Sequence, residues 1–156
     1  MSTIRVVWGT GTGPTETASY DAALAAANVH NYNLVTVSSV IPADATVEAV
    51  GTAPDLGPIG NRLTVVQARA TTATGRVSAG LGWSQTAEGP GLFYEAATET
   101  DEADVERRVR EGLAAGRDLR DWEFTDESVR TVTAEAGPGT YASAVVLAAY
   151  GRSTSI

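Results

Sequence analysis

The chain lacks both cysteine and lysine. All 11 of its basic residues are arginine, and none of its 156 residues is a cysteine. Without a thiol there are no disulfides, no thiolate metal ligands and no cysteine nucleophile. Without a lysine amine there is no Schiff base with pyridoxal phosphate and no Walker lysine for a nucleotide phosphate. The sequence therefore excludes thiol catalysis and lysine catalysis, and it leaves the redox compartment open.

Histidine is nearly absent as well, because His30 is the single histidine. A Ser-His-Asp triad would have to use it. A zinc site would need three further ligands from carboxylates alone, which is uncommon. We interpret His30 as a surface or packing residue near a helix end, and we expect no metal site.

Basic charge is also scarce relative to acidic charge. The chain has 19 Asp and Glu and a net charge of -8, which repels phosphate backbones, so we expect neither nucleic acid nor a membrane as partner. Acidic surfaces stay soluble when salt screens their charges, which suggests a halophilic host.

The start does not resemble a signal peptide, and no apolar run of 18 residues occurs, so we expect a cytoplasmic location.

The length predicts a single domain over residues 1–156. β-Branched and apolar runs predict strands, and runs of helix formers predict two principal helices. The expected strands are 4–8, 33–38, 62–74, 76–85, 91–98, 128–136 and 141–150, and the expected helices are 15–28 and 100–120.

The arrangement of these elements indicates the fold class. Short glycine turns between the three middle strands are typical of antiparallel hairpins. Residues 42–61 are rich in Pro, Gly and Ala and are expected to form a loop. Because strands outnumber helices, we predict an α+β fold, a layered α/β sandwich with mainly antiparallel sheets.

The glycine-rich run Gly9-Thr-Gly-Thr-Gly13 follows the first predicted strand. Such glycines can let backbone N–H groups approach a phosphate at a helix start. The spacing does not match the G-x-G-x-x-G dinucleotide motif, however. We favour a tight turn that sets the next helix against the sheet.

The dipeptide Ser38-Ser39 stands at the end of a predicted strand, shortly before Pro42. A serine pair by itself says little about function. Self-cleavage of a peptide bond needs a strained backbone, a hydroxyl over the preceding carbonyl and donors for the oxyanion. A strand that breaks just before a proline is able to supply such strain, so the bond is a candidate cleavage site.

The longer segment Asn33-Leu-Val-Thr-Val-Ser-Ser-Val-Ile-Pro42 resembles the processing segment of the pyruvoyl-dependent arginine decarboxylases. The upstream runs Gly9-Thr-Gly-Thr-Gly-Pro-Thr15 and Tyr20-Asp-Ala-Ala-Leu24 resemble the same family, in the same order. Downstream, Gly91-Leu-Phe-Tyr-Glu95 resembles the family segment that carries a catalytic glutamate. The resemblance covers nearly the whole chain.

This resemblance implies autocatalytic serinolysis between Ser38 and Ser39. The products are a beta chain of residues 1–38 and an alpha chain of residues 39–156, whose first residue becomes a covalent pyruvoyl group. That carbonyl takes the substrate amine and accepts electrons when CO₂ departs, which a chain without lysine could not otherwise arrange. The resemblance also implies a homo-oligomer, a trimer or a pair of trimers, with active sites between subunits.

Three further roles follow from the resemblance. Asp21 receives the substrate guanidinium, Glu95 donates a proton to the carbanion beside an apolar wall of Phe93 and Tyr94, and Asn33 hydrogen-bonds near the cleaved bond. The alternatives are a solvated acid on a helix for Asp21 and an exposed acid on a strand for Glu95.

The expected function is therefore decarboxylation of L-arginine to agmatine and CO₂, a lyase reaction that feeds polyamine biosynthesis or tRNA modification. A pyruvoyl decarboxylase for another amino acid is an alternative. A second alternative is an unprocessed relative that binds a small cationic metabolite or acts as a regulatory subunit.

Overall fold

The computed structural model of this chain describes residues 2–156. Its elements are β1 (Ser2–Gly13), α1 (Glu16–Ala26), β2 (Asn33–Thr36), β3 (Val40–Ile41), β4 (Ala45–Gly51), β5 (Arg62–Thr72), β6 (Gly75–Gln85), β7 (Gly91–Thr98), α2 (Glu102–Asp118), β8 (Ser128–Ala136) and β9 (Tyr141–Tyr150). The strands form two sheets, of order β2-β5-β9-β1-β4 and β3-β7-β6-β8. We call them the first and the second sheet.

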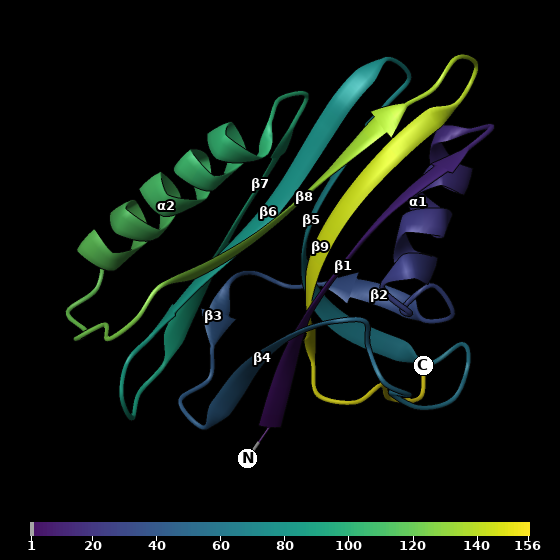
Figure 1. Ribbon diagram of the computed structural model, residues 1–156. Helices are drawn as coiled ribbons and strands as arrows, with labels where there is room; N and C mark the ends of the chain where they lie inside the picture. The colour runs from purple at the N-terminus through teal and green to yellow at the C-terminus, as the bar shows by residue number, and fades with distance from the viewer. Residues whose placement is uncertain (1) are drawn as a thin grey trace.

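The two sheets pack face to face, and one helix covers the outer face of each (Figure 1). Strand pairs β1–β4 and β2–β5 are parallel, and the other pairs are antiparallel. The four layers are therefore helix, sheet, sheet and helix. The predicted α+β sandwich with mainly antiparallel sheets and two principal helices is confirmed.

Alternation along the strands divides the core into three clusters. On β1, Val6 faces the second sheet, whereas Val7 faces α1. Strand β9 lies in the middle of the first sheet and is buried on both faces. Each buried Val, Leu or Ile contributes ~1.5–3 kcal/mol, so the inter-sheet cluster and the cluster under α1 both stabilise the fold substantially.

Helix α2 follows its predicted pattern closely. The Asp101 side chain caps it by accepting a hydrogen bond from the Asp104 N–H at 2.9 Å. Val105, Val109 and Leu113 are fully buried against the second sheet. The fourfold apolar spacing therefore correctly identified both the helix and its buried face.

The glycine-rich run is not the turn that the sequence predicts. Strand β1 continues through it to Gly13 and pairs with β9 along its length. A Cβ atom at Gly9 would lie 2.3 Å from the Ala23 carbonyl oxygen, and one at Gly11 would lie 2.4 Å from the Ala23 nitrogen. The glycines are thus needed because the backbone of α1 packs directly on β1.

Two further predictions are wrong. The predicted loop 42–61 contains β4, which pairs in parallel with β1. Strands β5 and β6 do not form a hairpin, because β5 belongs to the first sheet and β6 to the second. The turn at Gly75, where φ is +72°, instead carries the chain around the corner of the sandwich.

Within residues 2–156, no helix is both long and apolar enough to cross a membrane.

Candidate active site

The Ser38–Ser39 bond lies where the chain crosses from the first sheet to the second. Strand β2 ends at Thr36, two residues earlier than the sequence predicts, although the Val37 N–H still donates to the Val65 carbonyl at 2.9 Å. On the other side of the bond, the Phe93 N–H donates to the Ser39 carbonyl at 2.7 Å. Val37 and Ser39, on either side of Ser38, are therefore held by different sheets.

Ser38 itself is held by neither sheet. Among residues 2–156 it makes no hydrogen bond through its backbone or its side chain, and the side chain is exposed. Its carbonyl thus has no donor from the described part of the chain. This carbonyl is the one that the Ser39 hydroxyl would attack, so an oxyanion donor must come from elsewhere.

Glu95 lies close to this crossover on β7. Ser39 is hydrogen-bonded opposite Phe93, and Glu95 is two residues further along the same face of the strand. The Glu95 side chain is exposed in the single chain, yet partial burial by the surrounding protein still raises its pKa. Glu95 thus lies on the strand that is hydrogen-bonded to Ser39, two residues beyond the partner of Ser39, and its catalytic role stays a prediction.

Only half of the predicted apolar wall lies beside Glu95. Phe93 is fully buried between the sheets, with its ring centroid 6.4 Å from that of Trp83. Tyr94 points to the opposite face, where its ring packs against α2 at Gly112 and Gly116. Neighbouring residues of a strand face opposite sides, so Tyr94 cannot share the face of Glu95.

Asn33 lies at the far end of β2 from the cleavage site. Its side-chain amide donates to the Gly60 carbonyl at 2.8 Å, and the side chain remains exposed. Five residues of extended chain span ~16 Å, so Asn33 does not reach the Ser38–Ser39 bond of its own chain.

Asp21 is also apart from Ser39. It is exposed on α1, which packs on the outer face of the first sheet, whereas Ser39 adjoins β3 in the second sheet. Within residues 2–156, the Asp21 carboxylate has no hydrogen bond and no salt bridge. It is therefore available to a ligand or to another chain.

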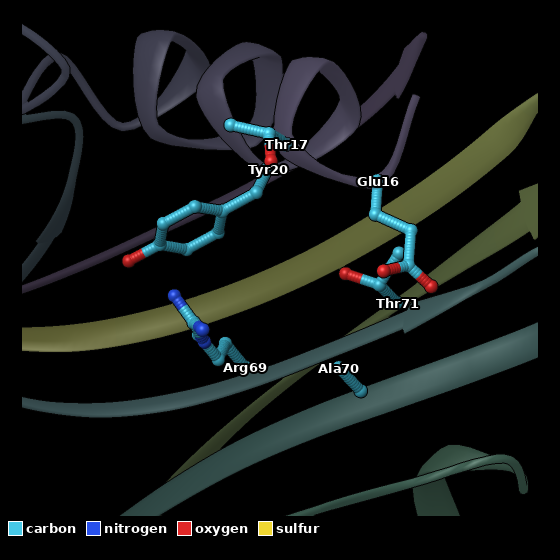
Figure 2. Close-up of a pocket in the computed structure, with 6 residues that line it drawn as sticks. All are labelled: Glu16, Thr17, Tyr20, Arg69, Ala70 and Thr71. Carbon is cyan, nitrogen blue, oxygen red and sulfur yellow. The ribbon is translucent and has the colours of Figure 1, made fainter. Parts of the chain in front are cut away.

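A surface pocket lies between α1 and β5, next to the turn of helix that carries Asp21. Figure 2 shows the residues that line it, which are Glu16, Thr17, Tyr20, Arg69, Ala70 and Thr71. The Arg69 guanidinium stacks on the Tyr20 ring at 4.4 Å, and the Tyr20 hydroxyl donates to Gln67 at 2.7 Å. Gln67 in turn donates to Thr36 at 3.3 Å, which connects α1 to the end of β2.

Sequence reasoning missed Gln67 and also Tyr150, whose hydroxyl donates to the Val40 carbonyl at 3.0 Å. No local pattern reveals either residue, because both contacts join distant parts of the chain. His30 has a buried Nδ1 without a hydrogen-bond partner among residues 2–156. In the same range, no group of three or more His, Cys, Asp or Glu side chains could hold a metal ion.

Comparison with known proteins gives a consistent result. A sequence model described as pyruvoyl-dependent arginine decarboxylase matches residues 3–155. The protein of that name from Halobacterium salinarum strain R1 is 61% identical over 157 residues, covering 100% of this chain and 98% of the relative. Another from Pyrococcus abyssi is 33% identical over 144 residues, covering 88% of this chain and 89% of the relative. A third, from Methanocaldococcus jannaschii, is 27% identical over 125 residues, covering 79% and 74%.

Proposed function

The chain belongs to the pyruvoyl-dependent arginine decarboxylase family, and from this premise we propose that it decarboxylates L-arginine to agmatine and CO₂ after cleaving itself between Ser38 and Ser39. The observation that carries the proposal is the position of this bond. The bond lies in a segment that links the two sheets, since Val37 is held by the first sheet and Ser39 by the second. Because both sides of the segment are held, its backbone has less freedom to move, which favours an intramolecular attack.

The proposed self-cleavage needs only groups of the chain and water. The Ser39 Oγ attacks the Ser38 carbonyl carbon, and the peptide C–N bond breaks to give an ester and a free amine. Elimination then removes the Cα proton of Ser39 and breaks its Cβ–Oγ bond, which releases the first chain with a carboxylate at Ser38. Water replaces the remaining nitrogen, ammonia leaves, and the former Cα of Ser39 becomes a ketone.

The surroundings of Ser39 fit such a pyruvoyl group. The Phe93 N–H and the pairing of Val40 with Leu92 would hold the new end of the alpha chain on the second sheet. When present, the group supplies a carbonyl that binds the substrate amine and accepts an electron pair as CO₂ leaves. Glu95, whose pKa is raised by burial, would hold a proton and deliver it to the substrate α-carbon.

The two proposed chains would stay together after cleavage. Residues 1–38 contain β1, which lies between β9 and β4 in the first sheet and pairs with both. They also contain α1, whose buried face joins Val7, Val145 and Leu147 in one cluster. Cleavage therefore produces two chains within one domain rather than two separate proteins.

We further propose a homo-oligomer, a trimer or a pair of trimers, in which neighbouring copies complete each site. The single chain keeps Asp21 and Asn33 away from Ser39, and residues 2–156 offer no donor to the Ser38 carbonyl. A neighbouring copy could bring the Asp21 carboxylate to the substrate guanidinium for a bidentate contact. It could also bring the second amide hydrogen of Asn33 to the cleaved bond. The absence of nucleic-acid and membrane partners and the cytoplasmic location stay predictions.

Intact-mass spectrometry of the purified protein tests the proposed cleavage. We expect two species that correspond to residues 1–38 and to residues 39–156 with a pyruvoyl end. Ser39→Ala should give one full-length species, because the nucleophile is gone. Ser38→Ala is the matched control, since it keeps both the nucleophile and the attacked carbonyl and should still cleave. A single full-length species from the unaltered sequence would overturn the proposal.

A further inference from the structure

Tyr150 connects the last strand of the fold to the segment that contains the cleavage site. It is the final residue of β9 in the first sheet, and its hydroxyl donates to the Val40 carbonyl at 3.0 Å. Val40 begins β3 in the second sheet and directly follows Ser39. This hydrogen bond therefore spans the two sheets immediately downstream of the Ser38–Ser39 bond.

The position of the Tyr150 ring is well determined by its neighbours. Its backbone pairs with Ile4 on β1, and its ring meets Phe93 edge-on, with centroids 6.1 Å apart at 63°. Phe93 is fully buried, and its own N–H donates to the Ser39 carbonyl. Two residues in mutual contact thus hold the carbonyls of Ser39 and Val40 in succession.

We propose that Tyr150 is a positioning residue for self-cleavage, which holds the Val40 carbonyl so that the Ser39 hydroxyl stays over the Ser38 carbonyl. This inference rests on the self-cleavage proposed above. Ser38 makes no hydrogen bond to any residue that the structure describes, so the geometry of the bond depends on the anchors at Val37 upstream and at Ser39 and Val40 downstream. The rate of an intramolecular attack follows the fraction of time spent in the reactive geometry.

The role of Tyr150 is to hold the backbone rather than to transfer a proton. Burial raises the pKa of its hydroxyl to about 12, so the group remains a donor throughout the neutral range. The hydroxyl contacts the carbonyl of Val40 and not that of Ser38. Its hydrogen bond is therefore the property that a variant should remove.

The test is a time course of cleavage after cell-free translation, followed on denaturing gels, for Tyr150→Phe and for Tyr141→Phe. Tyr150→Phe keeps the ring against Phe93 and loses one hydrogen bond, so we expect cleavage about two- to tenfold slower. Tyr141 lies at the other end of β9, and its hydroxyl makes no hydrogen bond to any of residues 2–156, so Tyr141→Phe should cleave at the unaltered rate.

Two measurements separate positioning from general stability. The Ser39→Ala chain cannot cleave, so it can be compared in thermal unfolding with the double variant Ser39→Ala, Tyr150→Phe. This comparison shows whether the uncleaved protein is folded at the assay temperature with and without the Tyr150 hydroxyl. After full cleavage, the KM for arginine of Tyr150→Phe should equal that of the unaltered enzyme, because the proposed role of Tyr150 is confined to the cleavage step.

Each outcome bears on one proposal. Cleavage of Tyr150→Phe at the unaltered rate, with the unaltered chain cleaving normally, would overturn the positioning role and leave the proposed function intact. A raised KM without slower cleavage would overturn it as well. If the unaltered chain itself does not cleave, the proposed function fails instead.

Discussion

Mixed oligomers provide a direct test of whether each active site combines two copies of the chain. The perturbation is co-expression of Asp21→Asn and Ser39→Ala chains with different affinity tags, followed by purification on both tags in turn. Asp21 lies on α1, outside the first sheet, whereas Ser39 adjoins the second sheet. A whole sheet therefore lies between them in one chain, and they can share a site only across an interface.

The expected magnitude follows from the symmetry of a ring. In a cyclic trimer, each site would take Asp21 from one copy and Ser39 from the next. A ring with two chains of one variant and one of the other has a single junction at which both residues are intact. Doubly purified trimers should therefore show about one third of the unaltered activity, whichever variant is in excess.

The assay is release of labelled CO₂ from arginine at low concentration. At low arginine concentration, trimers that contain only Asp21→Asn chains should be about 10- to 100-fold less active, because they lose a charge-assisted contact to the guanidinium. Ser39→Ala alone should be inactive. Mixed trimers no more active than the sum of the two parent trimers would refute the reasoning, since Asp21 and Ser39 would then act within one chain.

Three further outcomes are expected. Burial raises the pKa of Glu95 above its ordinary 4.5, so ionisation of Glu95 destabilises the fold as pH rises. The Tm of Glu95→Gln should therefore equal that of the unaltered protein below pH 4.5 and exceed it at pH 7. The same variant should lose about 10²–10⁴-fold in decarboxylation rate. The same difference in Tm between Glu95→Gln and the unaltered protein at both pH values would contradict this prediction. Gly11→Ala places a Cβ 2.4 Å from the Ala23 nitrogen and should lower Tm by about 3–10 °C, whereas the exposed Thr10→Ala should change it little. Because the net charge is -8, raising NaCl from about 0.1 M to about 2 M should raise Tm, and full stability in dilute buffer would exclude a salt requirement.

Local patterns predicted the elements whose residues respond mainly to their neighbours in sequence. The fourfold spacing of Val105, Val109 and Leu113 located α2 and its buried face, because a helix repeats within a few residues. The run Gly9–Gly13 misled the prediction, since glycine is typical of turns. In this chain the same residues form a strand, because the approach of α1 leaves no room for side chains.

For the candidate site as well, the sequence predicted which residues to consider, and the fold determined how they are arranged. The resemblance to the family pointed to Ser39, Glu95, Asp21 and Asn33, but it did not say which of them meet in one chain. The pairing of Ser39 with Phe93 brings Glu95 near the cleavage site, and the layering of the sandwich keeps Asp21 apart. Ser39 and Phe93 are 54 positions apart, and the two sheets pack through strands from all parts of the chain, so local patterns do not encode these relations.

The amino-acid composition and order were sufficient to exclude lysine and thiol chemistry, to indicate the family and to identify the bond that is expected to break. These conclusions depend on which side chains exist and in what order, and no folding is needed to reach them. The folded chain was needed to show that this bond links two sheets and that Tyr150 reaches Val40 across 110 positions. Such contacts arise only when the buried faces of both sheets pack together, because that packing sets the register of every distant pair.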